Sequence, residues 1–116
     1  MSASGALPDR EAGHPADAHP AAGFDELVHQ PNRLAILVVL QEAGRADFPY
    51  LKRLLELTDG NLGRHLAVLE EAGLVELHKG FEGKRPRTWA TITRKGRSRL
   101  EQELAAMRAL VRRFDG

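Results

Sequence analysis

Residues 57–75, LTDGNLGRHLAVLEEAGLV, constrain the fold more than any other stretch of the chain. Thr58 is the expected N-cap of a helix here, and Gly73 is its expected end. Three leucines recur at helical spacing and predict one buried stripe: Leu62, Leu66 and Leu69. Yet the first turns carry Gly60 and Gly63, and a glycine weakens a helix by about 1 kcal/mol relative to alanine. That cost, on the exposed side, requires an explanation.

Two helices are predicted before this stretch. The first covers residues 32–43, NRLAILVVLQEA, where apolar residues on nearly every side predict a central, buried helix. Asn32 is its expected cap and Gly44 its expected end. A short extended link, RADF, leads to a helix over residues 48–56, for which Asp47 is the expected cap. The apolar set of that helix is Tyr50, Leu51, Leu54 and Leu55.

Two strands and a last helix are predicted after it. Residues 74–81, LVELHKGF, alternate so that one face carries Val75 and Leu77, with Phe81 as a third candidate. In residues 87–93, RTWATIT, the alternating pair is Ala90 and Ile92. The charged loop EGKRP between them predicts an antiparallel hairpin. Thr93 is the expected cap of a helix over residues 94–114.

The N-terminal part divides into two segments. Residues 1–22 are rich in Ala, Pro, Gly and Asp and hold few large apolar side chains, which predicts a disordered tail whose removal changes little. Residues 23–116 then form one domain. It is expected to open with a short amphipathic helix that carries Phe24, Leu27 and Val28 and ends at Pro31.

Composition narrows the class of protein. Aromatic residues make up only 5% of the 116 residues, which is typical of a helical core of Leu, Val, Ile and Ala. There is no cysteine, so disulfides and thiolate metal sites are excluded. The longest apolar run, LAILVVL, is far too short to span a membrane. We therefore expect a cytoplasmic protein without a membrane partner.

Charge is distributed unevenly along the chain. The net charge is only +1. Residues 79–99, however, hold eight basic residues against Glu82 alone, a net charge of +7. A block that dense in a nearly neutral protein is a candidate anion-binding face.

The order of elements is that of a helix-turn-helix followed by a hairpin, or wing. With the sequences LTDGNLGRHLAVLEEAGLVE and GKRPRTWATITRKGRSRL, the chain resembles the small one-domain winged-helix transcriptional regulators of the MarR/ArsR type, from about residue 24 to residue 114. The resemblance implies a mainly α (α+β) fold with a two-stranded β-wing and flanking dimerisation helices. It also implies a sequence-specific regulator that binds double-stranded DNA, as a homodimer on a palindromic operator.

In a DNA-binding regulator, Gly60 and Gly63 can be explained by the approach of the helix to DNA. Small residues at the start of the recognition helix let its backbone approach the major groove, which is about 12 Å wide. Free N–H groups at the helix start bind phosphate, Asn61 suits adenine and Arg64 suits guanine. The predicted DNA-binding set in this helix is Thr58, Gly60, Asn61, Gly63, Arg64 and His65. For His65, phosphate contact and a place beside the buried stripe stay open as equal alternatives.

A second DNA-binding set lies in and after the wing. Lys84, Arg85 and Arg87 surround Pro86 and are predicted to reach phosphates or the minor groove. Arg94 and Lys95 lie in the first turn of the last helix, where the helix dipole disfavours cations. A bound phosphate would reverse that effect, so both are included.

The last helix supplies the predicted dimer contact. Its apolar residues step by 4, 3, 4 and 3, the spacing of a coiled-coil seam: Leu100, Leu104, Met107, Val111 and Phe114. The short N-terminal helix with Phe24, Leu27 and Val28 is expected to join it. The alternative is that the stripe folds back onto its own domain.

Other function classes have less support. No nucleophile, carboxylate pair or phosphate loop points to an enzyme, and five histidines without ligand spacing predict no metal site and no cofactor. A winged helix that binds protein instead of DNA remains the alternative. The operator, the controlled genes, activation or repression, and any effector are not encoded in a recognisable way.

Overall fold

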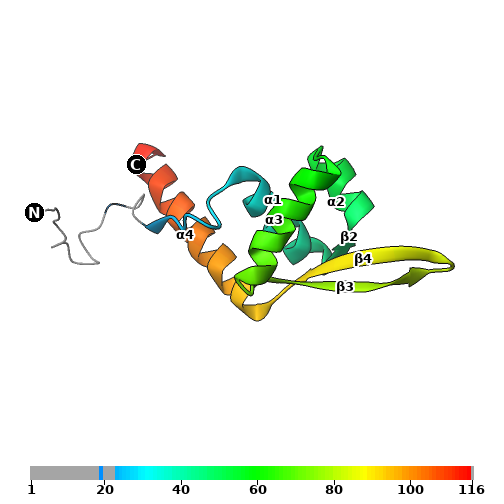
Figure 1. Ribbon diagram of the computed structural model, residues 1–116. Helices are drawn as coiled ribbons and strands as arrows, with labels where there is room; N and C mark the ends of the chain where they lie inside the picture. The colour runs from blue at the N-terminus through cyan, green and yellow to red at the C-terminus, as the bar shows by residue number, and fades with distance from the viewer. Residues whose placement is uncertain (1–18, 20–22, 116) are drawn as a thin grey trace, which may run out of the picture.

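The computed structural model describes His19 and residues 23–115, so the predicted disordered tail lies outside the described residues apart from His19. The described part contains four α-helices and a three-stranded antiparallel sheet (Figure 1). The elements in chain order are α1 Pro31–Ala43, β2 Arg45–Asp47, α2 Phe48–Leu55, α3 Asp59–Glu71, β3 Val75–Glu82, β4 Arg85–Ile92 and α4 Arg94–Asp115. The expected mainly α fold with a wing is confirmed.

Helix α1 begins one residue earlier than predicted. Its cap is Gln30, whose side chain accepts a hydrogen bond from the Arg33 N–H at 2.8 Å, so Asn32 is not the cap. Pro31 fits the first helical position because its missing N–H would have no intrahelical partner there. Gly44 ends the helix at a φ of 84°, as predicted. Three side chains of α1 are fully buried: Ile36, Leu37 and Leu40.

The link after α1 is a strand, where the sequence predicted only an extended connection. Strand β2 pairs with β4, and its Ala46 lies opposite Ala90. Both alanines are buried, which lets the strands lie close under α1 and α2. The sheet order is β2-β4-β3, so β4 is the central strand.

Helices α2 and α3 form the helix-turn-helix, and both predicted caps are confirmed. Asp47 Oδ1 accepts from the Tyr50 N–H at 2.8 Å, and Thr58 Oγ1 accepts from the Asn61 N–H at 3.1 Å. The predicted apolar set of α2 was partly wrong: Tyr50 is 41% exposed and Leu54 is 49% exposed. A helix of eight residues turns only one narrow face inward, and Leu51 occupies it.

The hairpin is longer and its turn tighter than predicted. Glu82 pairs with Arg85, which leaves only Gly83 and Lys84 in the turn. Gly83 has a φ of 64°, a conformation that favours glycine. Most of the predicted loop EGKRP is therefore strand, and the hairpin projects beyond the helices (Figure 1).

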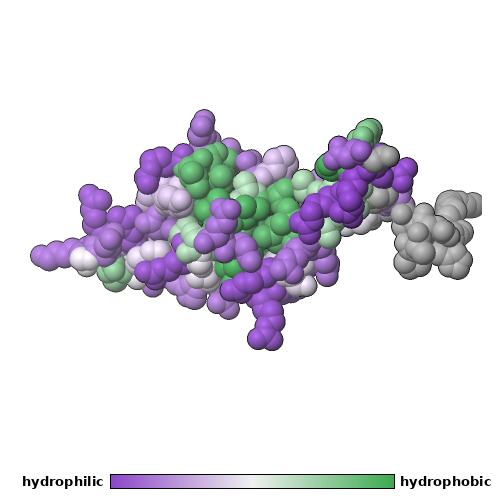
Figure 2. All heavy atoms as spheres, turned by 180° about the vertical axis from the view of Figure 1, so that it is seen from behind, coloured by the Kyte–Doolittle hydropathy of each residue, from purple (hydrophilic) through white to green (hydrophobic). Residues whose placement is uncertain are grey.

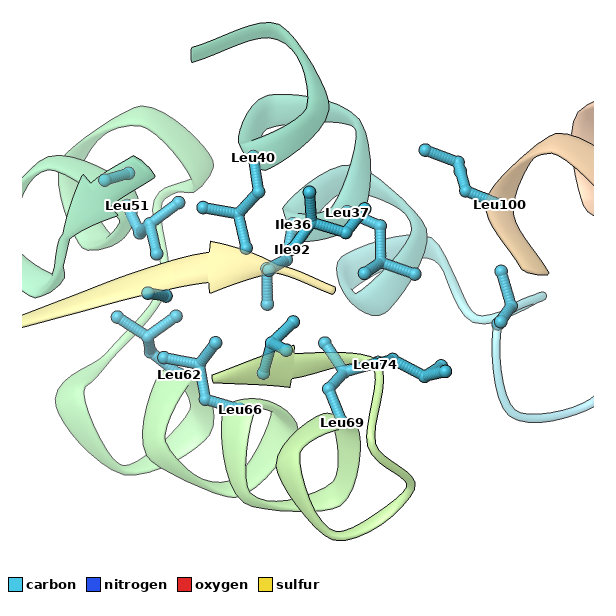
Figure 3. Close-up of a cluster of buried hydrophobic side chains, with 14 residues drawn as sticks. Ile36, Leu37, Leu40, Leu51, Leu62, Leu66, Leu69, Leu74, Ile92 and Leu100 are labelled. Carbon is cyan, nitrogen blue, oxygen red and sulfur yellow. The ribbon is translucent and has the colours of Figure 1, made fainter. Parts of the chain in front are cut away.

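One leucine-rich core joins all helices to the sheet. Side chains from α1, α3 and β4 point toward one another in Figure 3, with Leu51 and Leu100 at its two sides. The start of α4 lies against the segment before β3. A Cβ built on Gly96 would lie 2.2 Å from the Leu74 carbonyl oxygen, so only glycine fits there. Thr93 caps α4 through the Gly96 N–H, as predicted.

The segment before α1 is not the predicted amphipathic helix. Residues 26–28 form a turn, and Val28 is fully buried in the core. Polar contacts hold this segment on α4: the fully buried Glu103 accepts from the Asp25 N–H at 2.9 Å and contacts the His29 ring. Asp25 pairs with Arg99 at 2.5 Å, and this contact holds the pKa of Asp25 below its usual value. Side chains of α4 therefore hold this segment in place, and the predicted helix does not form.

Two features are not found in the part of the chain that the structure describes. No helix there is long and apolar enough to cross a membrane. No three His, Cys, Asp or Glu side chains among these residues are grouped so that they could hold a metal ion.

Candidate nucleic-acid interface

Helix α3 turns a small, polar face outward. Its leucines are buried beneath, while Gly60, Arg64 and Ala67 are exposed and Asn61 is half-exposed. Arg64 Nη1 donates to Asn61 Oδ1 at 3.1 Å, so the guanidinium and the amide lie together. Both groups retain donors for further bonds, and they are the side chains that pair with guanine and adenine edges.

The two glycines of α3 are not required by the fold. A Cβ built on Gly60 or Gly63 meets no heavy atom within 4 Å, and neither residue has a positive φ. Alanine would therefore fit both positions and would favour the helix. No contact among the described residues offsets the helix propensity that is lost at these two glycines. Their small size therefore favours a binding partner that approaches α3 from outside.

The acidic residue of this face is partly neutralised. Lys52 Nζ of α2 lies 3.0 Å from Asp59 Oδ1, and both side chains are largely exposed. Asp59 occupies the first turn of α3, where a carboxylate suits the positive end of the helix dipole. Its charge is thus accounted for without a role in DNA binding.

Of the two alternatives predicted for His65, phosphate contact or a place beside the buried stripe, the structure has the second. Its side chain lies beside the buried leucines with only 9% exposure. Arg33 Nη1 donates to His65 Nδ1 at 3.4 Å. Burial, followed by the charges of Arg33 and Arg64, lowers the pKa of His65. Burial and both arginines therefore disfavour the charged ring, and the small exposure of His65 disfavours its predicted phosphate contact.

Arg87 has a different environment from the one predicted. It lies in β4 and not in the loop, with Nη1 3.1 Å from Asp47 Oδ2 and Nε 2.7 Å from Glu82 Oε1. Asp47 is also the cap of α2. One guanidinium therefore ties both strands of the wing to the helix-turn-helix. Two acids neutralise it, so Arg87 positions the wing instead of offering a free charge.

The tip of the wing retains free cations. Lys84 lies in the turn and Arg85 begins β4, and both are exposed. Within the described residues neither side chain has a hydrogen bond or an ion pair. Of the three predicted wing residues, these two keep charges available for phosphate.

Arg94 and Lys95 differ from each other. Lys95 Nζ donates to the Ala72 carbonyl oxygen at 3.0 Å, where it satisfies an acceptor at the end of α3. This internal bond accounts for a cation in the first turn of α4. Arg94 is exposed and has no such bond among the described residues.

The predicted dimer stripe divides into two parts. Leu100 is only 2% exposed and Val28 is fully buried, so both belong to the core of their own chain and were wrongly placed in a dimer contact. Phe24 is half-buried and stacks on the His29 ring at 4.2 Å. Toward the C-terminus the stripe opens, with Val111 56% exposed and Phe114 87% exposed.

A hollow accompanies the open part of the stripe. It has a volume of about 380 Å³ and is lined by Leu104, Met107, Arg108, Val111 and Arg112. Together with the exposed Val111 and Phe114, it leaves apolar surface on α4 uncovered in the described chain. Figure 2 shows, from behind, a contiguous hydrophobic area across the middle of the molecule, bordered by hydrophilic side chains.

Sequence reasoning missed two polar contacts that shape this site. The Asp47–Arg87 pair joins residues 40 positions apart, and no local pattern signals it. Glu103 did leave a signal, because an acid stands beside Leu100 and Leu104 on the apolar side of the last helix. A charge at such a position predicts a buried polar partner.

Known proteins share this arrangement. The model of the winged helix DNA-binding domain family matches residues 32–111. An uncharacterized protein of Methanocaldococcus jannaschii is 48% identical over 65 residues, which cover 56% of this chain and 71% of that protein.

Solved structures agree with the family match. A transcriptional regulator homologue from Pyrococcus horikoshii is 34% identical, with a TM-score of 0.74 over 79% of this chain and 91% of that one. A probable transcriptional regulator from Pseudomonas aeruginosa is 28% identical, with a TM-score of 0.64 over 81% of this chain and 72% of that one. The chain therefore belongs to the winged helix DNA-binding domain family and has the fold of a DNA-binding regulator rather than that of an enzyme.

Proposed function

We propose that this protein is a transcriptional regulator that recognises a palindromic sequence in double-stranded DNA as a homodimer. The exposed face of α3 carries the proposal. A paired Asn61 and Arg64 stand beside two glycines whose side-chain space is empty. That combination fits the start of a recognition helix in the major groove, where base edges are read and the backbone must come close.

The individual contacts follow from this placement. Arg64 reads guanine and Asn61 reads adenine, while Thr58, Gly60 and Gly63 let the start of α3 approach a phosphate. Lys84 and Arg85 on the wing, and Arg94 at the start of α4, supply phosphate contacts outside the groove. Arg87 and Lys95 support these elements from within the fold.

The homodimer supplies the second half-site. One winged helix reads only a few base pairs, and two half-sites about one DNA turn apart give a longer sequence. The C-terminal part of the α4 stripe, where Val111 and Phe114 are exposed beside the hollow, supports a contact between two copies, because an apolar surface of this kind is stabilised by burial. A regulator must share a compartment with its DNA, so a cytoplasmic location is part of the proposal.

Selection of bound duplexes from a random pool tests the recognition contacts. Wild type should enrich a palindrome. Arg64→Ala should cost about 1–3 kcal/mol at the preferred site and relax base preference at one position of each half-site. Arg85→Ala should weaken all duplexes and lower the salt slope by about 1. An unchanged sequence profile for Arg64→Ala would contradict the assignment.

A control separates contact from net charge. Arg113→Ala removes one exposed positive charge at the far end of α4. It should leave both the preferred sequence and the salt slope unchanged. The alternative function, a winged helix that binds only protein, predicts that wild type shows no salt-dependent binding to any duplex.

Light scattering at micromolar concentration tests the homodimer. Wild type should have the mass of two chains, and Leu104→Lys/Met107→Lys should have the mass of one, because buried like charges facing their symmetry mates are costly. The matched control is Gln102→Lys/Ala105→Lys, which adds the same two charges at exposed positions of the same helix and should stay dimeric. A monomeric wild type would refute the dimer.

A further inference from the structure

Phe81 is a large apolar side chain near the tip of the wing, and it is not part of the buried core. The sequence allowed it a place beside Val75 and Leu77 in the core, but it is 70% exposed. The reason is the length of the hairpin. Val75 is buried and Leu77 is half-buried, whereas the strand beyond them extends past the helices and leaves Phe81 uncovered (Figure 1).

Phe81 lies on the same face of the sheet as the core. Side chains alternate along a strand, so Phe81 shares its face with Val75 and Leu77. Val75 belongs to the cluster that contains the buried leucines of α3. Pro86 lies directly across from Phe81 in β4 and adds a second exposed apolar group. The wing therefore presents apolar surface on the face against which the recognition helix packs.

The opposite face of the wing is already occupied. A Cβ on Gly80 would lie 3.2 Å from Trp89 Cζ3, so the indole ring covers Gly80 closely. The Arg45 guanidinium lies 5.2 Å from the centre of that ring. Arg87 on the same face is bound to Asp47 and Glu82. Trp89 and Arg87 are thus already in contact with other side chains on that face, whereas Phe81 is exposed on the other.

Cations lie on this face and at the tip beside it. Lys79 shares the face of Phe81, Lys84 lies in the turn, and Arg85 begins β4 on the opposite face. All three are exposed, and none of their side chains has an ion pair among the described residues. Glu82, the acid of this segment, is bound to Arg87. A phenylalanine near positive charges complements stacked bases that are flanked by phosphates. The minor groove of duplex DNA offers such a surface, because other proteins insert apolar wedges such as phenylalanine there between base steps.

We propose that Phe81 enters the minor groove of the bound duplex while Lys84 and Arg85 hold the phosphates on either side. This inference rests on the proposed function and adds a specific apolar contact to it. Because Phe81 carries no charge, its contribution to binding is independent of salt, unlike that of its cationic neighbours. Deformable base steps at the wing position would be preferred, since insertion must partly unstack them.

Fluorescence anisotropy with the selected duplex tests the contact. Phe81→Ala should bind roughly tenfold more weakly with an unchanged salt slope. Phe81→Leu should retain most of the affinity. The matched comparison is Lys84→Ala in the adjoining turn, which should lower the salt slope by about 1. Thermal melting should be the same for Phe81→Ala and wild type, because the ring is exposed in the free protein.

A photoreactive phenylalanine analogue at position 81 identifies the partner directly. With p-benzoylphenylalanine there, irradiation of the complex should link the chain to DNA near the edge of the half-site. A crosslink to a second copy of the chain would overturn the inference in favour of a protein contact. Wild-type binding that Phe81→Ala leaves unchanged overturns this inference alone, whereas a wild type that binds no duplex overturns the proposed function as well.

Discussion

Replacement of Gly63 should stabilise the protein and weaken its binding to DNA. Gly63 is in the second turn of α3 with a helical backbone, and the position of its Cβ is empty within 4 Å. Gly63→Ala should therefore add the full difference in helix propensity, about 0.5–1 kcal/mol. For a domain of roughly 100 residues this raises the melting temperature by about 2–8 °C.

A size series separates stability from recognition. Leucine is nearly as good a helix former as alanine, so Gly63→Leu should also melt above wild type. Its side chain would project where the backbone must approach the groove. DNA affinity should therefore fall in the order glycine, alanine, leucine, with a loss of about tenfold or more for leucine. Circular dichroism melting and anisotropy with the preferred duplex measure the two quantities on the same samples.

Gly44 provides the matched control. A Cβ there also meets no heavy atom within 4 Å, but the residue has a φ of 84°. Gly44→Ala should therefore destabilise the protein by about 1 kcal/mol, with no specific loss of DNA affinity. A Gly63→Leu variant that is more stable and binds DNA as well as wild type would refute the close approach of α3. A Gly63→Ala variant that melts no higher would refute the propensity argument.

Three further outcomes are expected. Gly96→Ala should destabilise the protein by about 3 kcal/mol or more in urea titrations, because its Cβ would lie 2.2 Å from a backbone oxygen; a loss below about 1 kcal/mol would contradict that packing. Burial and two arginines lower the pKa of His65, so the unfolded chain binds its proton more readily and stability should fall as pH drops through about 6.5. His65→Gln should reduce this slope between about pH 7 and 5.5, and an unchanged slope would assign it to other groups. Arg87→Ala should weaken binding to all duplexes and broaden amide signals along the wing in NMR spectra, since it frees the hairpin from α2; a rigid wing in this variant would show that the strands alone position it.

The elements and the exposed face of α3 were predictable from local patterns. The stripe of Leu62, Leu66 and Leu69, with Thr58 before it, determined where α3 lies and which side it buries, because helical periodicity and capping act within a few residues. The small, polar character of the exposed side, with two glycines next to Asn61 and Arg64, was also predictable, because these residues lie within the same two turns of the helix. The family resemblance then indicated how such elements are arranged.

Only the tertiary structure decided which charges are free. Lys84, Arg85, Arg87 and Lys95 look alike in the sequence, yet Arg87 is bound to Asp47 and Glu82, and Lys95 is bound to a carbonyl at the end of α3. These partners come from other elements, so no local pattern reveals them. In the same way, the sequence predicted a helix for Phe24, Leu27 and Val28, but the buried Glu103 binds that segment as a turn. Local periodicity determines what each element is, whereas contacts between distant segments determine which side chains remain available to a partner.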